Sequence, residues 1–217
     1  MANSASKQNT FEKPYLLIVE GKDDVNFFEA YLGYLSSLEN CQGVNDKFDI
    51  YSIGGKNNLP SILKTISKTP GFNNIKALAI ILDADSNPKA RFQSITNALK
   101  KANLPSPRKI MEASGKKPKV MIFLLPDSNR AGSLEDLCLE SVKNDPALSC
   151  IDKYFECLSD KKIKISANCS KAKCLAFLAS RPDLPNNVGI AAKQKIWPFA
   201  SPAFQNIKNF LINFFSL

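Results

Sequence analysis

The sequence contains no histidine, and this absence removes several kinds of active site. Ser-His-Asp and Cys-His nucleophilic sites need an imidazole to move the proton, and His-rich metal sites need it as a ligand. Any catalysis by this chain must therefore use carboxylates, lysine, tyrosine, cysteine or a bound metal.

Two further absences concern cysteine pairs and long apolar runs. The six cysteines include no C-x-x-C pair, which favours reduced, buried thiols over a zinc site or a disulfide framework. No stretch approaches the roughly 20 apolar residues that span a bilayer. Residues 1–14 also lack the apolar segment of a secretory signal. We therefore expect a cytoplasmic protein that does not engage a membrane.

Acidic residues are outnumbered, and the excess of positive charge is concentrated in two runs. The net charge is +9; residues 100–119 hold seven basic residues against Glu112 alone, and residues 161–173 hold five lysines and no acid. Such runs favour a polyanionic partner, most simply nucleic acid. A solvated, lysine-rich surface is the alternative explanation for each run.

Apolar β-forming runs alternate with segments of helical spacing, which predicts an α/β fold with a mostly parallel four-stranded sheet flanked by helices. The expected strands are residues 15–19, 48–53, 77–82 and 120–125. The expected helices are 23–35, 59–67, 91–104 and 133–142, followed by 151–158, 171–180 and 203–215. We divide the chain into a flexible N-terminus (1–13), an α/β domain (14–145) and a helical C-terminal extension packed on that domain (146–217).

Carboxylates follow two of the buried strands. Glu20 comes directly after the apolar residues 16–19, and Asp83 and Asp85 follow the apolar residues 78–82. Because the carboxyl ends of parallel strands meet at one edge of a sheet, we expect the three carboxylates to converge. Converging carboxylates repel one another unless a cation intervenes, which predicts a site for Mg²⁺ or Mn²⁺.

The stretch IVEGKDD at residues 18–24, followed by ILDAD at residues 81–85, resembles the TOPRIM domain. This domain occurs in topoisomerases, bacterial primases, ribosomal-RNA maturases and OLD-family nucleases; the resemblance covers about residues 14–142 and is strongest to small stand-alone members. It implies metal-dependent phosphoryl transfer on a nucleic-acid backbone. Asp83 and Asp85 would then hold the metal, and Glu20 would complete the site or act as a general base.

A second acidic group lies at residues 133–142, in the order SLEDLCLESV. By resemblance to OLD-type nucleases, which recruit extra acids from such a helix, Glu135, Asp136 and Glu140 are candidate ligands of a second metal. The alternative is a helix start in which Ser133 and Asp136 form a capping box and the acids complement the helix dipole. The resemblance also leaves open an ATPase or another protein partner.

Glycines beside lysines supply candidate phosphate contacts. Gly21 and Lys22 follow the first strand, and Gly55 and Lys56 follow the second; glycine lets a substrate approach the backbone closely. The second pair does not form a Walker loop, which has a different spacing.

Three functions remain open from the sequence. The first is a Mg²⁺-dependent nuclease or phosphotransferase acting on nucleic-acid phosphodiesters. The second is a non-catalytic nucleic-acid-binding or regulatory module with the same fold. The third is a haloacid-dehalogenase-like phosphatase, since Asp83 and Asp85 form a D-x-D pair, although that motif normally ends the first strand of its fold.

Overall fold

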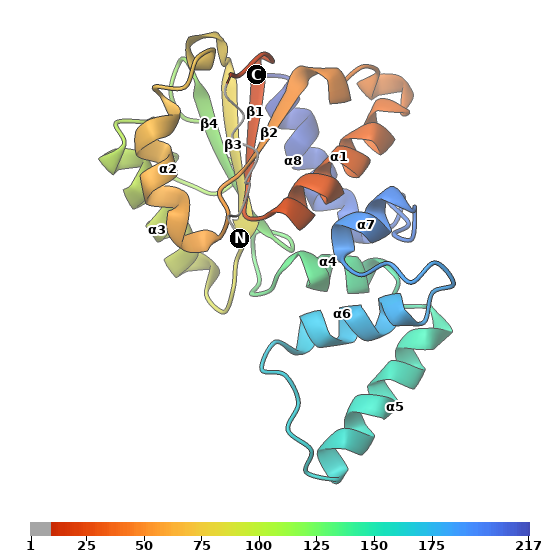
Figure 1. Cartoon of the computed structure of the whole chain (residues 1–217). Coiled ribbons are helices and arrows are strands. Elements are labelled where there is room, and N and C mark those ends of the chain that lie inside the picture. The colour runs from red at the N-terminus through yellow and green to blue at the C-terminus, as the bar shows by residue number, and fades with distance from the viewer. Residues whose placement is uncertain (1–9) are drawn as a thin grey trace, which may run out of the picture.

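The computed structural model describes residues 10–217 and contains a four-stranded, all-parallel sheet flanked by helices (Figure 1). The strands lie in the order β2-β1-β3-β4. Their bounds are β1 Tyr15–Val19, β2 Phe48–Ser52, β3 Ala77–Asp83 and β4 Lys119–Leu125. The predicted fold class is confirmed.

Successive residues of the central strands contribute to two different cores. In β3, Leu78 and Ile80 pack with α2 (Leu59–Ile66) and α3 (Pro88–Lys101), whereas Ala79 and Ile81 pack on the opposite face. This division follows from the two-residue period of a strand, and it explains why the runs are continuously apolar. Both faces of the sheet are therefore covered by helices.

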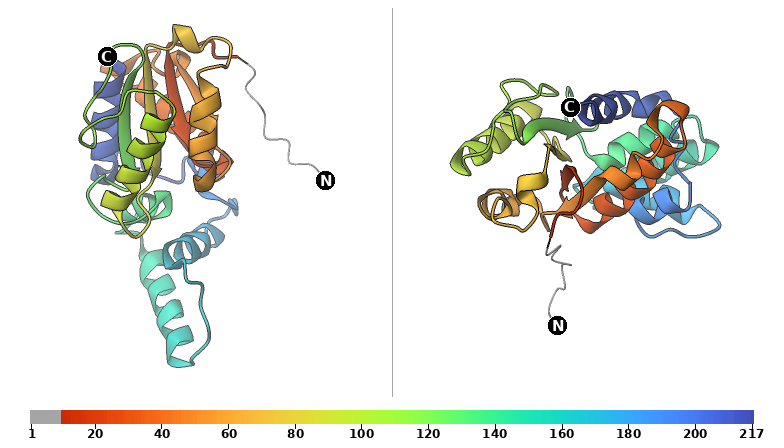
Figure 2. Two further views of the ribbon diagram at one scale, coloured as in Figure 1. Left: turned by 90° about the vertical axis from the view of Figure 1, so that its left-hand side faces the viewer. Right: turned by 90° about the horizontal axis from the view of Figure 1, so that it is seen from above.

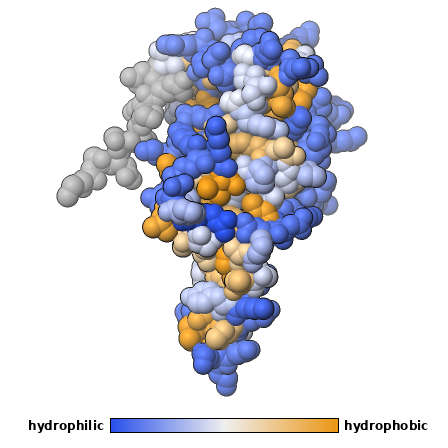
Figure 3. Space-filling model, turned by 90° about the vertical axis from the view of Figure 1, so that its right-hand side faces the viewer, coloured by the Kyte–Doolittle hydropathy of each residue, from blue (hydrophilic) through white to orange (hydrophobic). Residues whose placement is uncertain are grey.

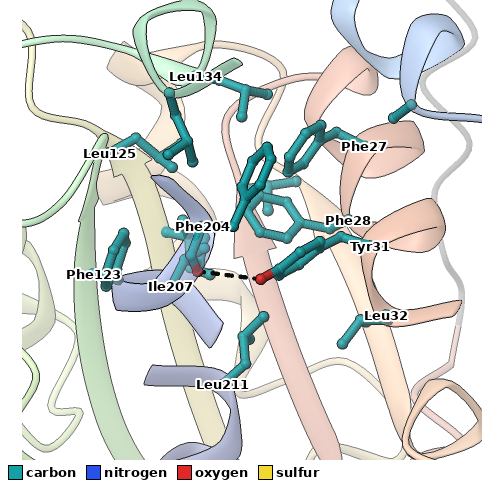
Figure 4. Close-up of a cluster of buried hydrophobic side chains, with 14 of the residues drawn as sticks. Phe27, Phe28, Tyr31, Leu32, Phe123, Leu125, Leu134, Phe204, Ile207 and Leu211 are labelled. Carbon is teal, nitrogen blue, oxygen red and sulfur yellow. Dashed lines mark hydrogen bonds between the residues drawn. The ribbon is translucent and has the colours of Figure 1, made fainter. Parts of the chain in front are cut away.

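The second face is covered by helices from both ends of the chain. They are α1 Lys22–Ser36, α4 Leu134–Ser141, α7 Val188–Lys193 and α8 Gln205–Phe215. Figure 4 shows Phe28 and Tyr31 of α1 meeting Ile207 and Leu211 of α8 in this core, where the Tyr31 hydroxyl donates to the Phe204 carbonyl at 3.3 Å. The C-terminal helices α7 and α8 thus complete the hydrophobic core of the sheet domain.

Two helices leave this body and form a projection, which we call the arm (residues 146–179). It consists of α5 Pro146–Asp160, a connecting loop and α6 Cys169–Ala179, and it extends from the end of the molecule at which the strands finish (Figures 1 and 2). Apolar side chains appear on its surface in Figure 3, in agreement with exposed fractions of 50% for Ile163 and 43% for Leu175.

Several helix boundaries differ from those predicted, because capping residues set them. The first helix begins at Lys22, one residue before the predicted start, and its N-cap is Gly21 instead of Asp23 or Asp24, the two residues that the sequence offered for this position. Asp24 accepts a hydrogen bond from Gly21 N–H at 2.9 Å. The third begins at Pro88, since the side chain of Asn87 caps it. Pro is favoured in a first helical turn.

Two differences concern the C-terminal part. Helix α5 begins at Pro146, capped by Asp145, five residues before the predicted start. The six-residue α7 was not predicted, because Asn187 caps a segment too short to show helical periodicity. Its Gly189 approaches α1 so closely that an added Cβ would lie 2.4 Å from the Asp23 carbonyl oxygen.

The predicted flexible N-terminus falls partly outside the described residues, which begin at position 10. Within the described part, Phe11 is 2% exposed and its N–H donates to the Pro70 carbonyl. The N–H groups of Glu12 and Lys13 both donate to Asp49 Oδ2, at 2.8 and 3.0 Å. Residues 11–13 therefore pack on the domain.

The cysteines are free, but they are not all buried as expected. Three lie in the core and three lie exposed on the arm, where apolar sequence neighbours do not guarantee burial. The buried ones are Cys41, Cys138 and Cys174, and the exposed ones are Cys150, Cys157 and Cys169. Within residues 10–217, no helix has the length and apolar character needed to cross a membrane.

Candidate functional site

The candidate site lies at the carboxyl ends of β1 and β3, where open α/β sheets have their ligand crevice, and we call this region the crevice. These strands are neighbours, yet the chain leaves β1 toward α1 on one face of the sheet and leaves β3 toward α3 on the other. Such a switch point is the usual ligand site of open α/β sheets. Glu20 follows β1 and Asp83 ends β3, and the pairing of Ile18 with Ile80 places the two acids at nearly the same level.

Asp83 is the acid most strongly affected by its surroundings. Burial raises its pKa well above the ordinary value, and the negative charges of Asp24, Glu135 and Glu20 raise it further. A hydrogen bond from Leu134 N–H to Oδ1, at 3.0 Å, opposes this shift. The negative charges that act on Asp83 thus come from the residue after β1, from α1 and from α4.

The neighbouring carboxylates show the same effect. Burial raises the pKa of Asp24 to about 7, against the hydrogen bond from Gly21 N–H, and the charges of Glu20 and Glu135 add to the rise. Burial also raises the pKa of Glu20, where the opposing influence is the guanidinium of Arg91. Burial is thus the main cause of the raised pKa in these acids, and negatively charged neighbours add to it.

Arg91 is a site residue that the sequence analysis missed. Its Nη2 lies 3.4 Å from Glu20 Oε2, its Nε donates to the Asp83 carbonyl at 3.2 Å, and its side chain is only 11% exposed. It therefore links the ends of both strands. The signal in the sequence was Asn87-Pro88, an N-cap followed by a first-turn proline, which places Arg91 one turn into α3.

Asp85 is held differently from Asp83. The strand ends at Asp83, and Asp85 adopts a left-handed conformation (φ 53°) with its backbone paired to Gly132 in both directions. Asp83 and Asp85 therefore do not project together as alternate residues of one strand would. Both carboxylate oxygens of Asp85 accept from Lys56 Nζ at 3.2 Å, and its charge still raises the pKa of Glu20.

The acids of α4 have three different environments. The charge of Glu135 acts on both Asp24 and Asp83, so Glu135 belongs to the crevice. Asp136 forms the capping box with Ser133, and its Oδ1 accepts from Ser170 Oγ at 2.5 Å. Glu140 lies at the other end of the helix and pairs with Lys143 at 2.9 Å. The structure thus brings only Glu135 to Asp83.

The glycine and lysine candidates lie on the loops that border the crevice. Gly55 N–H donates to the Glu20 carbonyl at 3.0 Å, which joins the loop after β2 to the end of β1. Gly55 has a φ of 118°, a conformation that L side chains rarely adopt. Lys22 is exposed at the first position of α1, and Lys56 is 49% exposed beside Asp85.

The donor chemistry of the crevice fits a hard divalent cation. Carboxylate oxygens are the ligands that Mg²⁺ and Mn²⁺ prefer. Burial, with the negative charge of neighbouring acids, raises the pKa values of Glu20, Asp24 and Asp83, and a bound cation would favour their ionised forms. Within the described part of the chain, no three acidic, cysteine or histidine side chains are arranged as a ready-made metal site. Binding would therefore require side-chain adjustment.

The fold and crevice define an α/β protein with a carboxylate cluster at the switch point of a parallel sheet. The chain belongs to the family described as "Protein of unknown function (DUF3226)", whose model matches residues 14–216. No curated protein matches this chain.

Two solved structures of the C-terminal region of the Xanthomonas campestris pv. campestris OLD protein are similar to this chain. The one phased with iodine has a TM-score of 0.48 and 13% identity, covering 95% of this chain and 97% of that chain. The one phased with mercury has a TM-score of 0.49 and 13% identity, covering 95% and 98%.

Proposed function

We propose that this protein is a Mg²⁺- or Mn²⁺-dependent nuclease or related phosphotransferase that acts on nucleic-acid phosphodiesters through a TOPRIM-like site. The observation that carries this proposal is the convergence of Glu20 and Asp83, from neighbouring parallel strands, with Asp24 and Glu135 around one crevice. The resemblance of residues 18–24 and 81–85 to the TOPRIM motifs supports it.

The acids of the crevice would hold the cation, with Glu20 and Asp83 as its first ligands and Glu135 available beside them. A bound divalent ion neutralises charge that develops on phosphoryl oxygens. Arg91 positions the Glu20 carboxylate and limits its rotation. Because burial raises the pKa of Glu20, this carboxylate is also a better proton acceptor than an exposed glutamate.

Two lysines supply phosphate contacts at the rim. Lys22 precedes the acidic first turn of α1, and Lys56 is held beside the crevice by Asp85. An incoming phosphodiester would exchange the exposed Lys56–Asp85 pair for a Lys56–phosphate contact, at little energetic cost because exposed ion pairs contribute at most about 1 kcal/mol.

Strand cleavage with matched variants tests the proposal. Purified protein is incubated with single-stranded and duplex DNA and RNA in Mg²⁺, in Mn²⁺ and in EDTA. We expect cleavage only with a divalent ion, and a loss of about 100-fold or more in Asp83→Asn and Glu20→Gln. The control is Glu39→Gln, which removes one exposed carboxylate outside the crevice. Wild-type cleavage rates in both crevice variants would overturn the proposal.

A non-catalytic nucleic-acid-binding module is the second candidate. The observation that favours it is that both Glu20 and Asp85 already have cationic partners, Arg91 and Lys56. Such a module would bind nucleic acid equally well in EDTA, and neither Mg²⁺ nor Mn²⁺ would induce cleavage. No observation favours the phosphatase alternative.

A further inference from the structure

The arm is tied directly to the candidate site. Ser170, at the start of α6, donates to Asp136 Oδ1 at 2.5 Å. Asp136 caps α4, and Leu134 N–H, in the first turn of that helix, holds Asp83. One short chain of contacts therefore connects the start of α6 to the most strongly perturbed carboxylate of the crevice.

The Cys174 thiol, also on α6, is influenced by the same acids of α4. Burial raises the pKa of the Cys174 thiol to about 12, the charges of Glu135 and Asp136 add to the rise, and Lys171 lowers it. Cys174 thus lies within the influence of both the crevice acids and a lysine of α6. Lys171 directly follows Ser170, whose hydroxyl contacts Asp136 at the start of α4.

The arm carries exposed lysines that form no ion pair within residues 10–217. The loop after α5 and the first turn of α6 carry four such lysines. These arm lysines are Lys161, Lys162, Lys164 and Lys171. The acids of α5 recur every four residues, at Asp152, Glu156 and Asp160, and Asp152 pairs with Lys173 at 2.6 Å.

The other basic run lies at the opposite edge of the sheet. It ends at Lys119, which pairs with Ala77 at the beginning of β3, whereas Asp83 ends that strand. At about 3.3 Å per residue, the two ends of β3 are about 20 Å apart. The basic run of the arm therefore lies on the same side of the molecule as the carboxylates, extending from the tip of the arm, where the loop after α5 begins, back to the start of α6 (Figure 1).

The geometry points to the arm as a nucleic-acid-binding surface, in which the arm lysines hold the phosphodiester backbone of a strand that extends from the crevice. This inference rests on the proposed function for its choice of partner. The arm extends from the edge of the sheet that carries the acids, as Figure 1 shows, so one strand can contact both. A lysine–phosphate contact releases condensed counterions, which makes such binding dependent on salt.

Two variants with equal changes in charge test this inference. The arm variant combines Lys161→Ala, Lys162→Ala, Lys164→Ala and Lys171→Ala. The far-edge control combines Lys100→Ala, Lys101→Ala, Lys116→Ala and Lys117→Ala, four exposed lysines of the other run. Binding of fluorescein-labelled single-stranded DNA, duplex DNA and RNA oligonucleotides is measured by anisotropy in EDTA, over a range of salt concentrations. Circular dichroism and Tm confirm that both variants fold.

We expect the arm variant to bind at least about 10-fold more weakly than wild type and to lose about 3 units of the slope of log Kd against log salt, because about 0.7 of a counterion is released per single-strand phosphate contact. The control should retain its affinity within about twofold. Equal weakening in both variants, or no weakening in either, would overturn the inference.

The measurement separates this inference from the proposed function, since it needs neither metal nor cleavage. If the arm variant loses binding and the wild-type protein never cleaves in Mg²⁺ or Mn²⁺, the arm is a nucleic-acid-binding surface but the proposed nuclease activity is wrong. If the wild-type protein cleaves with a divalent metal and the arm variant binds as well as wild type, the nuclease activity is supported but the arm is not the binding surface. The three oligonucleotide types show which kind of strand the arm binds.

Discussion

Asp49 and Asp83 are both well-buried aspartates of the same sheet, and the difference between them separates a structural carboxylate from a candidate functional one. Asp49, in β2, is 6% exposed and accepts from two backbone N–H groups at the amino edge. Asp83, at the carboxyl edge, accepts from one N–H group and faces three other carboxylates. Asp83 is less completely buried than Asp49, so the surrounding charge, and not burial alone, is the informative feature.

The largest expected effect is on activity. Asp83→Asn preserves the side-chain shape and can still accept from Leu134 N–H, but it removes a metal ligand, so we expect a loss of cleavage of about 100- to 1,000-fold. Asp49→Asn should leave the cleavage rate per folded molecule unchanged. Single-turnover cleavage in Mn²⁺ measures both. Equal losses in the two variants would abolish the distinction between the two aspartates.

The next largest effect is on stability, and here the variant of Asp49 is expected to lose more than the variant of Asp83. Asp49→Ala removes the acceptor for Glu12 and Lys13 N–H, and we expect the free energy of unfolding to fall by about 3 kcal/mol, because charged hydrogen bonds contribute about 1.5–3 kcal/mol each. Asp83→Asn should not destabilise the metal-free protein, since it relieves repulsion among carboxylates. Urea unfolding in EDTA measures both values, and a larger loss in Asp83→Asn would contradict the assigned roles.

The smallest effect concerns the pH dependence of stability. A carboxyl group whose folded pKa is raised contributes stability below its unfolded pKa, near 4, and this contribution is lost as pH rises through the folded value. For Asp24 that value is about 7. In EDTA, Asp24→Asn should therefore raise Tm at pH 8 by about 5 °C and change it little at pH 4. The exposed neighbour Asp23 provides the control Asp23→Asn.

Added divalent cation gives the complementary measurement for Asp24. Mg²⁺ or Mn²⁺ competes with protons for the crevice acids, so the wild-type Tm should rise more at pH 8 than at pH 5. The same rise at both pH values, or none at either, would argue against a cation among these carboxylates.

The strands, their parallel pairing and most helices were predictable because apolar runs and helical spacing are local properties of the sequence. The placement of Glu20 and Asp83 at strand ends was predictable for the same reason. The contribution of Asp24 was hidden because its carboxylate also caps α1. Arg91 was missed because its role depends on where Asn87 starts α3.

The sequence by itself determined which segments become strands and that acids follow two of them, since burial of apolar runs and the polarity of turns depend on neighbouring residues. Only the tertiary structure decided which of those acids meet. It turned Asp85 toward Lys56, brought Glu135 to Asp83, and placed one lysine run on the arm and the other at the far edge of the sheet. These outcomes depend on strand order and on contacts between distant segments, which local patterns do not specify.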